Sequence, residues 1–392
     1  MKAEAAIASG ADWRDALTEV VQQMPMLEEK GGVDLALLFA HSAYEADFPE
    51  LVAEVKRATG AKTLIGCSGQ GIIGPEREVE REPAISLQAF SLPGSLLVPV
   101  RITEEDIENG DKAQAWAERV DTSRYMVNSW LAFADPFWDV NEMLKLIWSV
   151  YPGNAVVGGL ASHHMGMHHT YLFMDDQVFE DGAVAVAMGG SYRVRPVVSQ
   201  GCKPIGEPWT ITAAEENVIQ TIGMRRALDV LVETYRGLAP DLQNRARTNT
   251  LVGLAMNEYK DEFGRGDFLV RNLMGIDQES GAIIIGGAIP RPGQTIQFQL
   301  RDPEAAHEDL EQLLVAMKDE LGGIQPVGAL LCACNGRGLS LFGQEHHDVK
   351  TVNELLGPMP IAGFFCNGEI GPIGGKNFIH GFTASVGIIA KR

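Results

Sequence analysis

Apolar residues near the start of the chain follow the spacing of an α-helix. They recur at steps of four, three, four and three residues, at Trp13, Leu17, Val20, Met24 and Leu27. One turn of an α-helix takes about 3.6 residues, so these side chains share one face. The pattern predicts a packing helix within residues 1–30.

Beyond that helix, four blocks of sequence share one order. Each has an apolar strand with a polar end, an intervening segment, and a second apolar strand that runs into glycine. The separations between comparable points are 27, 25, 30 and 29 residues, for Phe39 to Gly66, Phe133 to Gly158, Met256 to Gly286 and Cys334 to Gly363. Such regularity indicates internal duplication.

Two blocks fall in each half of the chain, so the sequence predicts two similar α/β domains. We expect an N-terminal helix over residues 1–30, one domain over 31–215 and a second over 216–392, where Thr212 can cap the first helix. Strand–helix–strand units favour parallel pairs, whereas the strands after the glycines are close enough for antiparallel pairing. Each domain is therefore expected to be a mixed β-sheet flanked by helices.

The composition excludes several kinds of partner. The 392 residues include 32 Lys and Arg against 52 Asp and Glu, which gives a net charge of −20. That charge repels nucleic acid and anionic membranes, because both are bound through clustered Lys and Arg. The start of the chain is not typical of a signal peptide, and no run approaches the roughly 18 apolar residues that span a bilayer. We expect a cytoplasmic protein with reduced cysteines that binds neither nucleic acid nor membrane.

The glycine-ended strands predict where a ligand binds. Strands of one orientation deliver their terminal loops to the same sheet edge, where α/β proteins commonly bind ligands. The fourth block has the richest ends, because Cys-Asn-Gly occurs at residues 334–336 and again at 366–368. Arg337 follows the first tripeptide and Glu369 follows the second. The simplest interpretation is an ion pair between these two residues that closes both loops.

Several segments together resemble the FIST domain. Similarity to its C-terminal half lies at residues 328–338, 360–372 and 380–385, and similarity to its N-terminal half at residues 65–68, 71, 157–159 and 181–183. The resemblance covers roughly residues 30–390 and implies a sensory module that binds small molecules, with amino acids as the suggested class. The family also occurs in eukaryotic F-box proteins. Because no kinase, receptor or F-box segment is recognisable here, signal output would need a separate partner protein.

The residue chemistry and the resemblance together predict a ligand pocket. Its members are Asn335, Arg337, Gly338, Phe364, Asn367, Gly368, Glu369 and His380, with Cys67 and Ser68 from the N-terminal half. In this pocket Arg337 grips a carboxylate, Glu369 accepts an ammonium group and Phe364 covers the apolar portion of an amino acid. In the alternative interpretation Arg337 and Glu369 form a partly exposed ion pair, whose loss would cost only about 0–1 kcal/mol.

A thiol-dependent enzyme is an alternative function. Cys366 or Cys67 would be the nucleophile and His380 its base, because a thiol needs a neighbouring base to become the reactive thiolate. The alternation of Phe378, His380 and Phe382 is more typical of a hydrogen-bonded histidine on a strand. The sequence has neither a phosphate-binding loop nor a dinucleotide-binding glycine motif. We predict no catalytic residue and no cofactor.

A run of histidines stands out at residues 163–169, with sequence His-His-Met-Gly-Met-His-His. Imidazoles at this density can bind Zn, Ni or Cu, but a metal site usually needs ligands from a rigid frame. Because the run falls in a loop between strands, we predict no metal site there. A protein-interaction scaffold without any ligand is a third possible function, and the sequence has no feature that separates it from the others.

Overall fold

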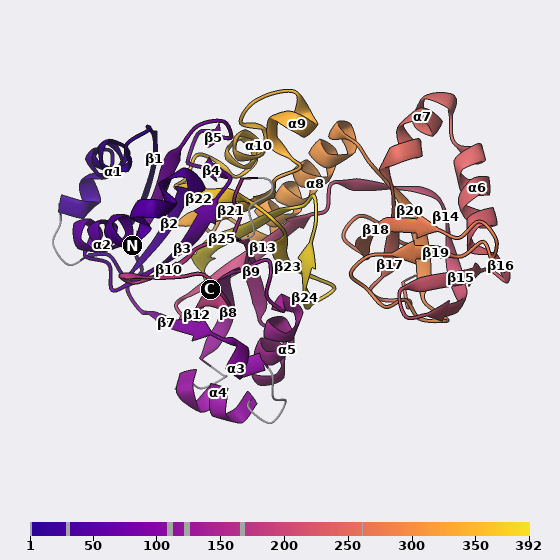
Figure 1. Ribbon diagram of the computed structural model, residues 1–392, viewed down its shortest axis with the longest axis horizontal. Coiled ribbons are helices and arrows are strands. Elements are labelled where there is room, and N and C mark those ends of the chain that lie inside the picture. Colours follow the sequence, from indigo (N-terminus) through magenta and orange to yellow (C-terminus); the bar gives the residue numbers. More distant parts are fainter. Residues whose placement is uncertain (1, 29–31, 108–112, 121–125, 165–168, 261) are drawn as a thin grey trace. The chain divides into compact units, whose positions relative to one another are not determined.

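The computed structural model describes residues 2–28, 32–107, 113–120, 126–164, 169–260 and 262–392. The chain forms two compact units: Met1–Val198 with Leu313–Arg392 (unit 1), and Ser199–Gln312 (unit 2). Figure 1 labels their elements, in which helices combine with mixed sheets as the sequence predicts. Residue 215, where the sequence suggests a domain boundary, ends strand β14 (Cys202–Glu215) within unit 2.

Unit 1 contains three six-stranded sheets that share one strand order. The first sheet has the order β1–β6–β2–β3–β10–β11, and its central strands β2 (Leu35–His41) and β3 (Thr63–Gly69) are parallel. Its antiparallel strands are β1 (Lys2–Ser9), β6 (Ala84–Ser91), β10 (Leu172–Met174) and β11 (Gln177–Phe179). Helix α2 (Phe48–Thr59) connects the parallel pair; it has Pro49 in its first turn and ends at the left-handed Gly60.

The second and third sheets repeat this arrangement. The second has the order β7–β12–β8–β9–β23–β24, with β8 (Val127–Ala134) parallel to β9 (Ala155–Leu160) across helix α5 (Val140–Val150). The third has the order β13–β25–β21–β22–β4–β5, with β21 (Gly328–Cys334) parallel to β22 (Ile361–Cys366). The flanking strands are β7 (Ser95–Ile102), β12 (Ala183–Gly190), β23 (Glu369–Ile373), β24 (Lys376–His380), β13 (Tyr192–Ser199), β25 (Ala384–Lys391), β4 (Gly71–Ile73) and β5 (Glu78–Val79). Three of the four predicted blocks are thereby confirmed as parallel strand–helix–strand units.

Short hairpins join the three repeats into a ring. The hairpin β4–β5 follows β3 in the sequence but pairs beside β22 of the third sheet. The hairpin β10–β11 follows β9 and pairs beside β3, and the hairpin β23–β24 follows β22 and pairs beside β9. Each repeat gives one hairpin and receives another, which explains why the C-terminal residues belong to the same unit as the N-terminal ones.

Equivalent glycines mark the second strand of each parallel pair. Gly66, Gly158 and Gly363 lie opposite Leu38, Ala132 and Leu331, respectively. A Cβ atom on any of the three glycines would lie 1.7–1.8 Å from the carbonyl oxygen of its neighbour on the first strand. The close approach of the two backbones explains why these three blocks have a glycine at this position.

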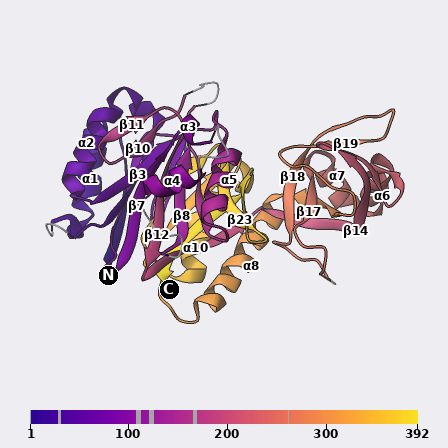
Figure 2. The same ribbon diagram turned by 90° about the horizontal axis from the view of Figure 1, so that it is seen from below.

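The three sheets share a central core. Phe39 of β2, Phe133 of β8 and Phe364 of β22 meet there, with ring centroids 5.1–5.9 Å apart. On the opposite face of β2, residues such as Leu38 pack in the cluster that includes α1 (Trp13–Gln22) and α2. Figures 1 and 2 show α1 and α2 beside the first sheet, and α4 (Ala113–Val120) and α5 beside the second. Because both faces of the central strands are covered, their sequences are almost continuously apolar.

The N-terminal segment contains more than the predicted helix. Helix α1 buries Trp13, Leu17 and Val20, as the apolar spacing predicts. It ends at Gln22, and Leu27 falls in a separate 3-10 helix, Pro25–Glu28. The residues before α1 form strand β1, which pairs with β6 along its whole length. The helix over 1–30 is therefore shorter than expected.

Unit 2 has a seven-stranded sheet that contains the strands of the third block. The strands are β14, β20 (Thr295–Arg301), β17 (Thr250–Ala255), β18 (Phe268–Ile276), β19 (Ile283–Ile285), β15 (Val218–Ile222) and β16 (Arg225–Arg226), in spatial order. β17 and β19 both pair antiparallel with β18, which lies between them, so this block is not a parallel unit joined by a helix. The separation between its two strands is similar to that in the other three blocks, because strand β18 takes up about as many residues as the helix between the strands of those blocks.

The predicted helix after Thr212 is also wrong. Thr212 lies within β14, and its hydroxyl is 2.7 Å from that of Thr221 on the antiparallel neighbour β15. The helix begins only at α6 (Ala227–Gly237), followed by α7 (Pro240–Asn249). Helix α8 (Pro303–Leu321) comes next in the sequence and is followed by β21 of the third sheet. Among the described residues, no helix combines the length and apolar character needed to cross a membrane.

Candidate functional site

Strand ends from all three repeats meet at Ser162, which directly follows β9 and Ala161. Its hydroxyl accepts a hydrogen bond from the Gln70 backbone N–H at 2.7 Å and donates one to the Phe365 carbonyl at 2.5 Å. Its own backbone N–H donates to the Ser68 carbonyl at 3.1 Å. Ser68 and Gln70 belong to the first repeat and Phe365 to the third, so one serine links all three. The carboxyl ends of parallel strands are where α/β folds most often bind ligands.

The two Cys-Asn-Gly turns lie side by side at the end of the third repeat. The Asn335 side-chain amide donates to the Asn367 side-chain oxygen at 2.8 Å, and the Asn335 backbone N–H donates to the Cys366 carbonyl at 3.1 Å. The Asn367 N–H donates to the carbonyl of Leu160 at the end of β9. Asn367 is exposed, and the buried Oδ1 of Asn335 has no hydrogen-bond partner among the described residues.

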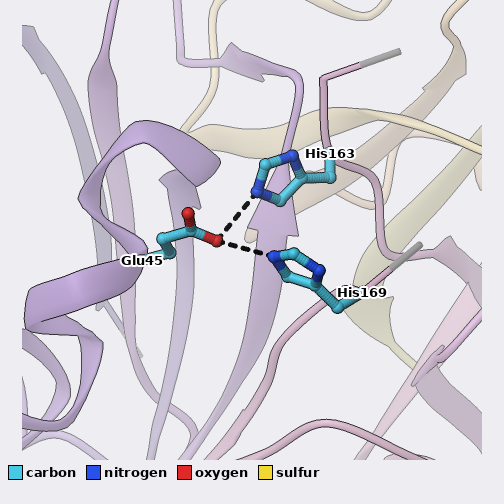
Figure 3. A group of neighbouring side chains, drawn as sticks. All are labelled: Glu45, His163 and His169. Carbon is cyan, nitrogen blue, oxygen red and sulfur yellow. Dashed lines mark hydrogen bonds and ion pairs between the residues drawn. The ribbon is translucent and has the colours of Figure 1, made fainter. Parts of the chain in front are cut away.

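A carboxylate and two imidazoles converge beside these strand ends (Figure 3). The Glu45 Oε2 atom lies 3.0 Å from Nε2 of His163 and 3.0 Å from Nε2 of His169. Glu45 belongs to the 3-10 helix Ser42–Asp47 that follows β2. Desolvation raises the pKa of Glu45, but the hydrogen bonds to the two histidines outweigh it, so the pKa is lowered overall.

More imidazoles surround this group. The ring of His164 lies 5.1 Å from that of His41 and 5.6 Å from that of His163, measured between centroids. Burial, and then the charge on His164, lower the pKa of His41 to about 4, so His41 is neutral at pH 7. We call His41, Glu45, Ser162, His163, His169, Asn335 and Asn367 the strand-end site.

The structure gives Arg337 a different partner from the one expected. Its Nε and one terminal nitrogen bind the two Asp348 carboxylate oxygens at 2.7 and 2.8 Å, and neither side chain is more than 1% exposed. Glu369 is buried elsewhere in the network, where it accepts hydrogen bonds from the Thr383 N–H at 3.0 Å and the Cys366 thiol at 3.3 Å. Both side chains are buried, so the partial exposure expected for an Arg337–Glu369 pair is wrong, and the ion pair that the structure gives Arg337 is with Asp348.

Other residues of the predicted pocket are buried beneath the strand ends. Phe364 stacks on Phe39 in the central core. Ser68 donates its hydroxyl to the Ser162 carbonyl at 3.2 Å, and the His380 Nε2 lies 3.0 Å from the Gly371 carbonyl. Cys67 and Gly368 are likewise buried, which leaves Asn335 and Asn367 as the predicted residues nearest the surface.

Gly338 begins α9 (Gly338–Phe342) with a φ of +61°, and the Glu80 carboxylate lies close to this turn. Glu80 accepts the Leu339 N–H at 2.9 Å. Glu78 accepts the Val349 N–H of α10 (His347–Leu356) at 2.9 Å, and its second oxygen has no hydrogen-bond partner in the described part of the chain. Burial, and then the Asp348 charge, raise the pKa of Glu78 to about 8.

The raised pKa of Glu78 predicts a pH-dependent stability. Between pH 4.5 and about 8 the unfolded chain has lost the Glu78 proton while the folded chain keeps it, so the contribution of Glu78 to stability falls as pH rises. Glu78→Gln removes that loss. The melting temperature of the variant minus that of the parent protein should therefore be larger at pH 8.5 than at pH 5, as measured by differential scanning fluorimetry.

The matched control for this prediction is Glu50→Gln, because the Glu50 side chain is 64% exposed. Its melting-temperature difference from the parent should be the same at both pH values. Equal differences for Glu78→Gln at the two pH values would contradict the assigned burial of a neutral carboxyl group.

The geometry of the cysteines is unfavourable for thiol catalysis. No disulfide joins any of the five cysteines, all of which lie in the described part of the chain, and burial raises the pKa of the Cys67 and Cys366 thiols well above the ordinary value. The Cys366 thiol donates to the Ala333 carbonyl at 3.2 Å and to Glu369, and the His380 Nε2 contacts a backbone carbonyl. A thiolate would thus form in an apolar environment beside a carboxylate.

The members of the strand-end site that the sequence analysis does not name are His41, Ser162 and Glu45. Glu45 supplies the carboxylate of this site. It lies 118 residues from His163 and in no recognisable motif. The sequence feature that could have identified Glu45 is its position directly after the first strand of the first block. The ring of repeats brings the end of that strand close to the end of β9. The run at 163–169 was identified, and its members 165–168 lie outside the described residues.

Two family models together match most of the chain. The FIST N domain model matches residues 34–225, and the FIST C domain model matches residues 227–372. An uncharacterized protein of Mycobacterium tuberculosis strain H37Rv is 37% identical over 99% of both chains, and one of Mycobacterium bovis is 34% identical over 99% of this chain and 98% of its own. A cyanuric acid hydrolase structure is 8% identical over the whole of both chains with a TM-score of 0.32, a likeness too slight to carry an argument.

Proposed function

Because this chain belongs to the FIST family, whose domains are associated with sensory signal transduction, we propose that it is a sensory protein that binds a small ligand. The ligand is an amino acid or a related small carboxylate, and it binds at the strand-end site. The observation that supports this proposal is the convergence of polar groups from all three repeats around Ser162. Such convergence at the carboxyl ends of parallel strands is typical of ligand sites.

The chemistry of the site suits both ends of an amino acid. Glu45, with a lowered pKa, is ionised and can accept an ammonium group. The side-chain amides of Asn335 and Asn367 can donate to a carboxylate after the hydrogen bond between them rearranges. Arg337, engaged by Asp348, holds the loop rather than the ligand in this proposal.

The rest of the proposal concerns location and output. We place the protein in the cytoplasm, with a separate partner protein that receives the signal. The net charge of −20 supports a protein partner over nucleic acid or an anionic membrane.

Ligand binding predicts a rise in thermal stability. Each of the twenty amino acids and a set of small dicarboxylates is added to the purified protein, and the melting temperature is measured. A ligand at 100 times its dissociation constant should add about 2.7 kcal/mol to the free energy of unfolding. The double variant Asn335→Ala, Asn367→Ala should lose this gain, because both amides contact the ligand, while Asn244→Ala, at an exposed position in α7, should keep it.

Two outcomes would contradict the proposed site. If no compound raises the melting temperature of the protein, the protein-interaction scaffold becomes the better explanation. If a compound does so equally in the double variant, the ligand binds elsewhere. A hollow of about 580 Å³ lined in part by Glu4, Glu76 and Lys350 is then the location to test, with Lys350→Ala.

A further inference from the structure

We propose that Glu45, His163 and His169 bind one divalent transition-metal ion, with zinc as the representative ion. This inference goes beyond the small-ligand proposal, because metal binding needs only these three side chains. With the ion on Oε2 of Glu45, an ammonium group would be accepted by Oε1 of the same carboxylate. The ligand atoms are Oε2 of Glu45 and Nε2 of each histidine, which point toward one another in Figure 3.

The distances between the ligand atoms fit a metal of this size. Glu45 Oε2 lies 3.0 Å from both imidazole nitrogens, and one atom from each side chain lies within 4.8 Å of the others. Zinc binds nitrogen and oxygen at about 2.0–2.2 Å, which in a tetrahedral site separates ligand atoms by about 3.4 Å. The three side chains therefore need only small movements to coordinate an ion.

The two histidines extend from anchored backbone at the two ends of the loop in which the sequence analysis expects no metal site. His163 follows Ser162, which is held by hydrogen bonds to the first and third repeats. His169 precedes Thr170, whose buried hydroxyl donates to Asp135 at 2.9 Å. The next residue, Tyr171, donates its backbone N–H to the Ser68 hydroxyl at 3.1 Å. These contacts supply the rigid frame that a metal site requires.

Glu45 is held from two sides. Its 3-10 helix connects β2 directly to α2. The Tyr171 hydroxyl donates to the same Oε2 atom at 3.3 Å, so an outer hydrogen bond orients the carboxylate, as is usual around bound metals.

The metal-free protein keeps a proton where the metal would bind. The His164 backbone N–H donates to Nδ1 of His163 at 2.8 Å, so in the neutral ring the proton is on Nε2, which donates to Glu45. When the ion binds Nε2, that proton leaves and Nδ1 takes one up, which breaks the contact with His164. The binding step thus exchanges one backbone hydrogen bond for a metal–nitrogen bond.

The ligand set selects the class of ion. Two imidazoles and one carboxylate suit Zn²⁺, Co²⁺, Ni²⁺ or Fe²⁺, whereas Mg²⁺ and Ca²⁺ prefer oxygen ligands alone. Three protein ligands leave a coordination position open for water or another small molecule.

The test uses the full-length protein without an affinity tag and zinc chloride alone. After dialysis against micromolar zinc, metal content is measured by mass spectrometry, and affinity by competition with a chromophoric chelator. We expect about one zinc per chain, no binding of magnesium, and a loss of affinity of more than about tenfold in each of Glu45→Gln, His163→Ala and His169→Ala. His307→Ala, at an exposed helical position in unit 2, is the matched control and should bind zinc as the parent does.

The test remains decisive if one variant fails to fold. The His163 side chain is only 5% exposed, whereas Glu45 and His169 are 35% and 38% exposed and tolerate substitution better. Folding of each variant is checked by circular dichroism. Absence of stoichiometric zinc, or zinc retained at parental affinity in Glu45→Gln and His169→Ala, would overturn the metal site. The zinc experiment contains no amino acid. Its failure would therefore not contradict the small-ligand proposal, which is tested separately by the melting-temperature measurements.

Discussion

Arg337→Ala is expected to lower the free energy of unfolding by about 3–5 kcal/mol, because it leaves the Asp348 carboxylate buried without its cation. The Asp348 side chain is 1% exposed and receives two hydrogen bonds from the guanidinium group. Arg337 also lowers the pKa of Asp348 against the opposing effect of burial. Urea unfolding followed by circular dichroism measures the loss.

The matched control is Arg14→Ala, which removes an ion pair to Glu50 whose side chains are 52% and 64% exposed. It should change stability by about 0–1 kcal/mol. A second check is the double variant Arg337→Ala, Asp348→Ala, which should cost less than the sum of the two single variants, since they share one interaction. An effect of Arg337→Ala as small as that of Arg14→Ala would mean that the ion pair is exposed in solution.

The difference between the expected and observed partners of Arg337 illustrates what sequence reasoning can supply. The two Cys-Asn-Gly turns were expected to lie together, and Asn335 and Asn367 do form a hydrogen bond. The sequence analysis predicted an ion pair between Arg337 and Glu369 because these two charged residues occupy equivalent positions after the two turns. The actual partner, Asp348, lies on α10 eleven residues after Arg337, and nothing in the local pattern distinguishes it from other acidic residues.

The same limit applies to the fold. Apolar strands that end in glycine correctly predicted the parallel pairs of three blocks, because two covered faces and a close backbone approach leave a local signature. The strand β1 was missed, since its sequence is rich in alanine and only its pairing with β6 makes it a strand. The order of the strands depends on hairpins exchanged between repeats, and periodicity within one repeat carries no information about that exchange.

Gly158→Ala is expected to prevent folding or to lower the free energy of unfolding by more than about 4 kcal/mol, which is beyond the usual range for one substitution. The new Cβ atom would lie 1.8 Å from the Ala132 carbonyl oxygen, and the obstacle is backbone rather than a flexible side chain. To relieve the overlap, β8 and β9 must separate and lose the hydrogen bonds of their parallel pairing. Soluble yield and urea unfolding measure the effect.

The same loss of stability is expected at the equivalent glycines of the other two repeats. Gly66→Ala and Gly363→Ala place their Cβ atoms 1.7 and 1.8 Å from the equivalent carbonyl oxygens, so all three variants should be similarly damaged. Gly381→Ala is the control, because a Cβ atom there meets nothing within 4 Å and the glycine is exposed. It should unfold at the urea concentration of the parent protein. If the three strand variants matched Gly381→Ala instead, the parallel pairs could not lie in the register that brings their carboxyl ends together at Ser162, and the strand-end site would lose its structural basis.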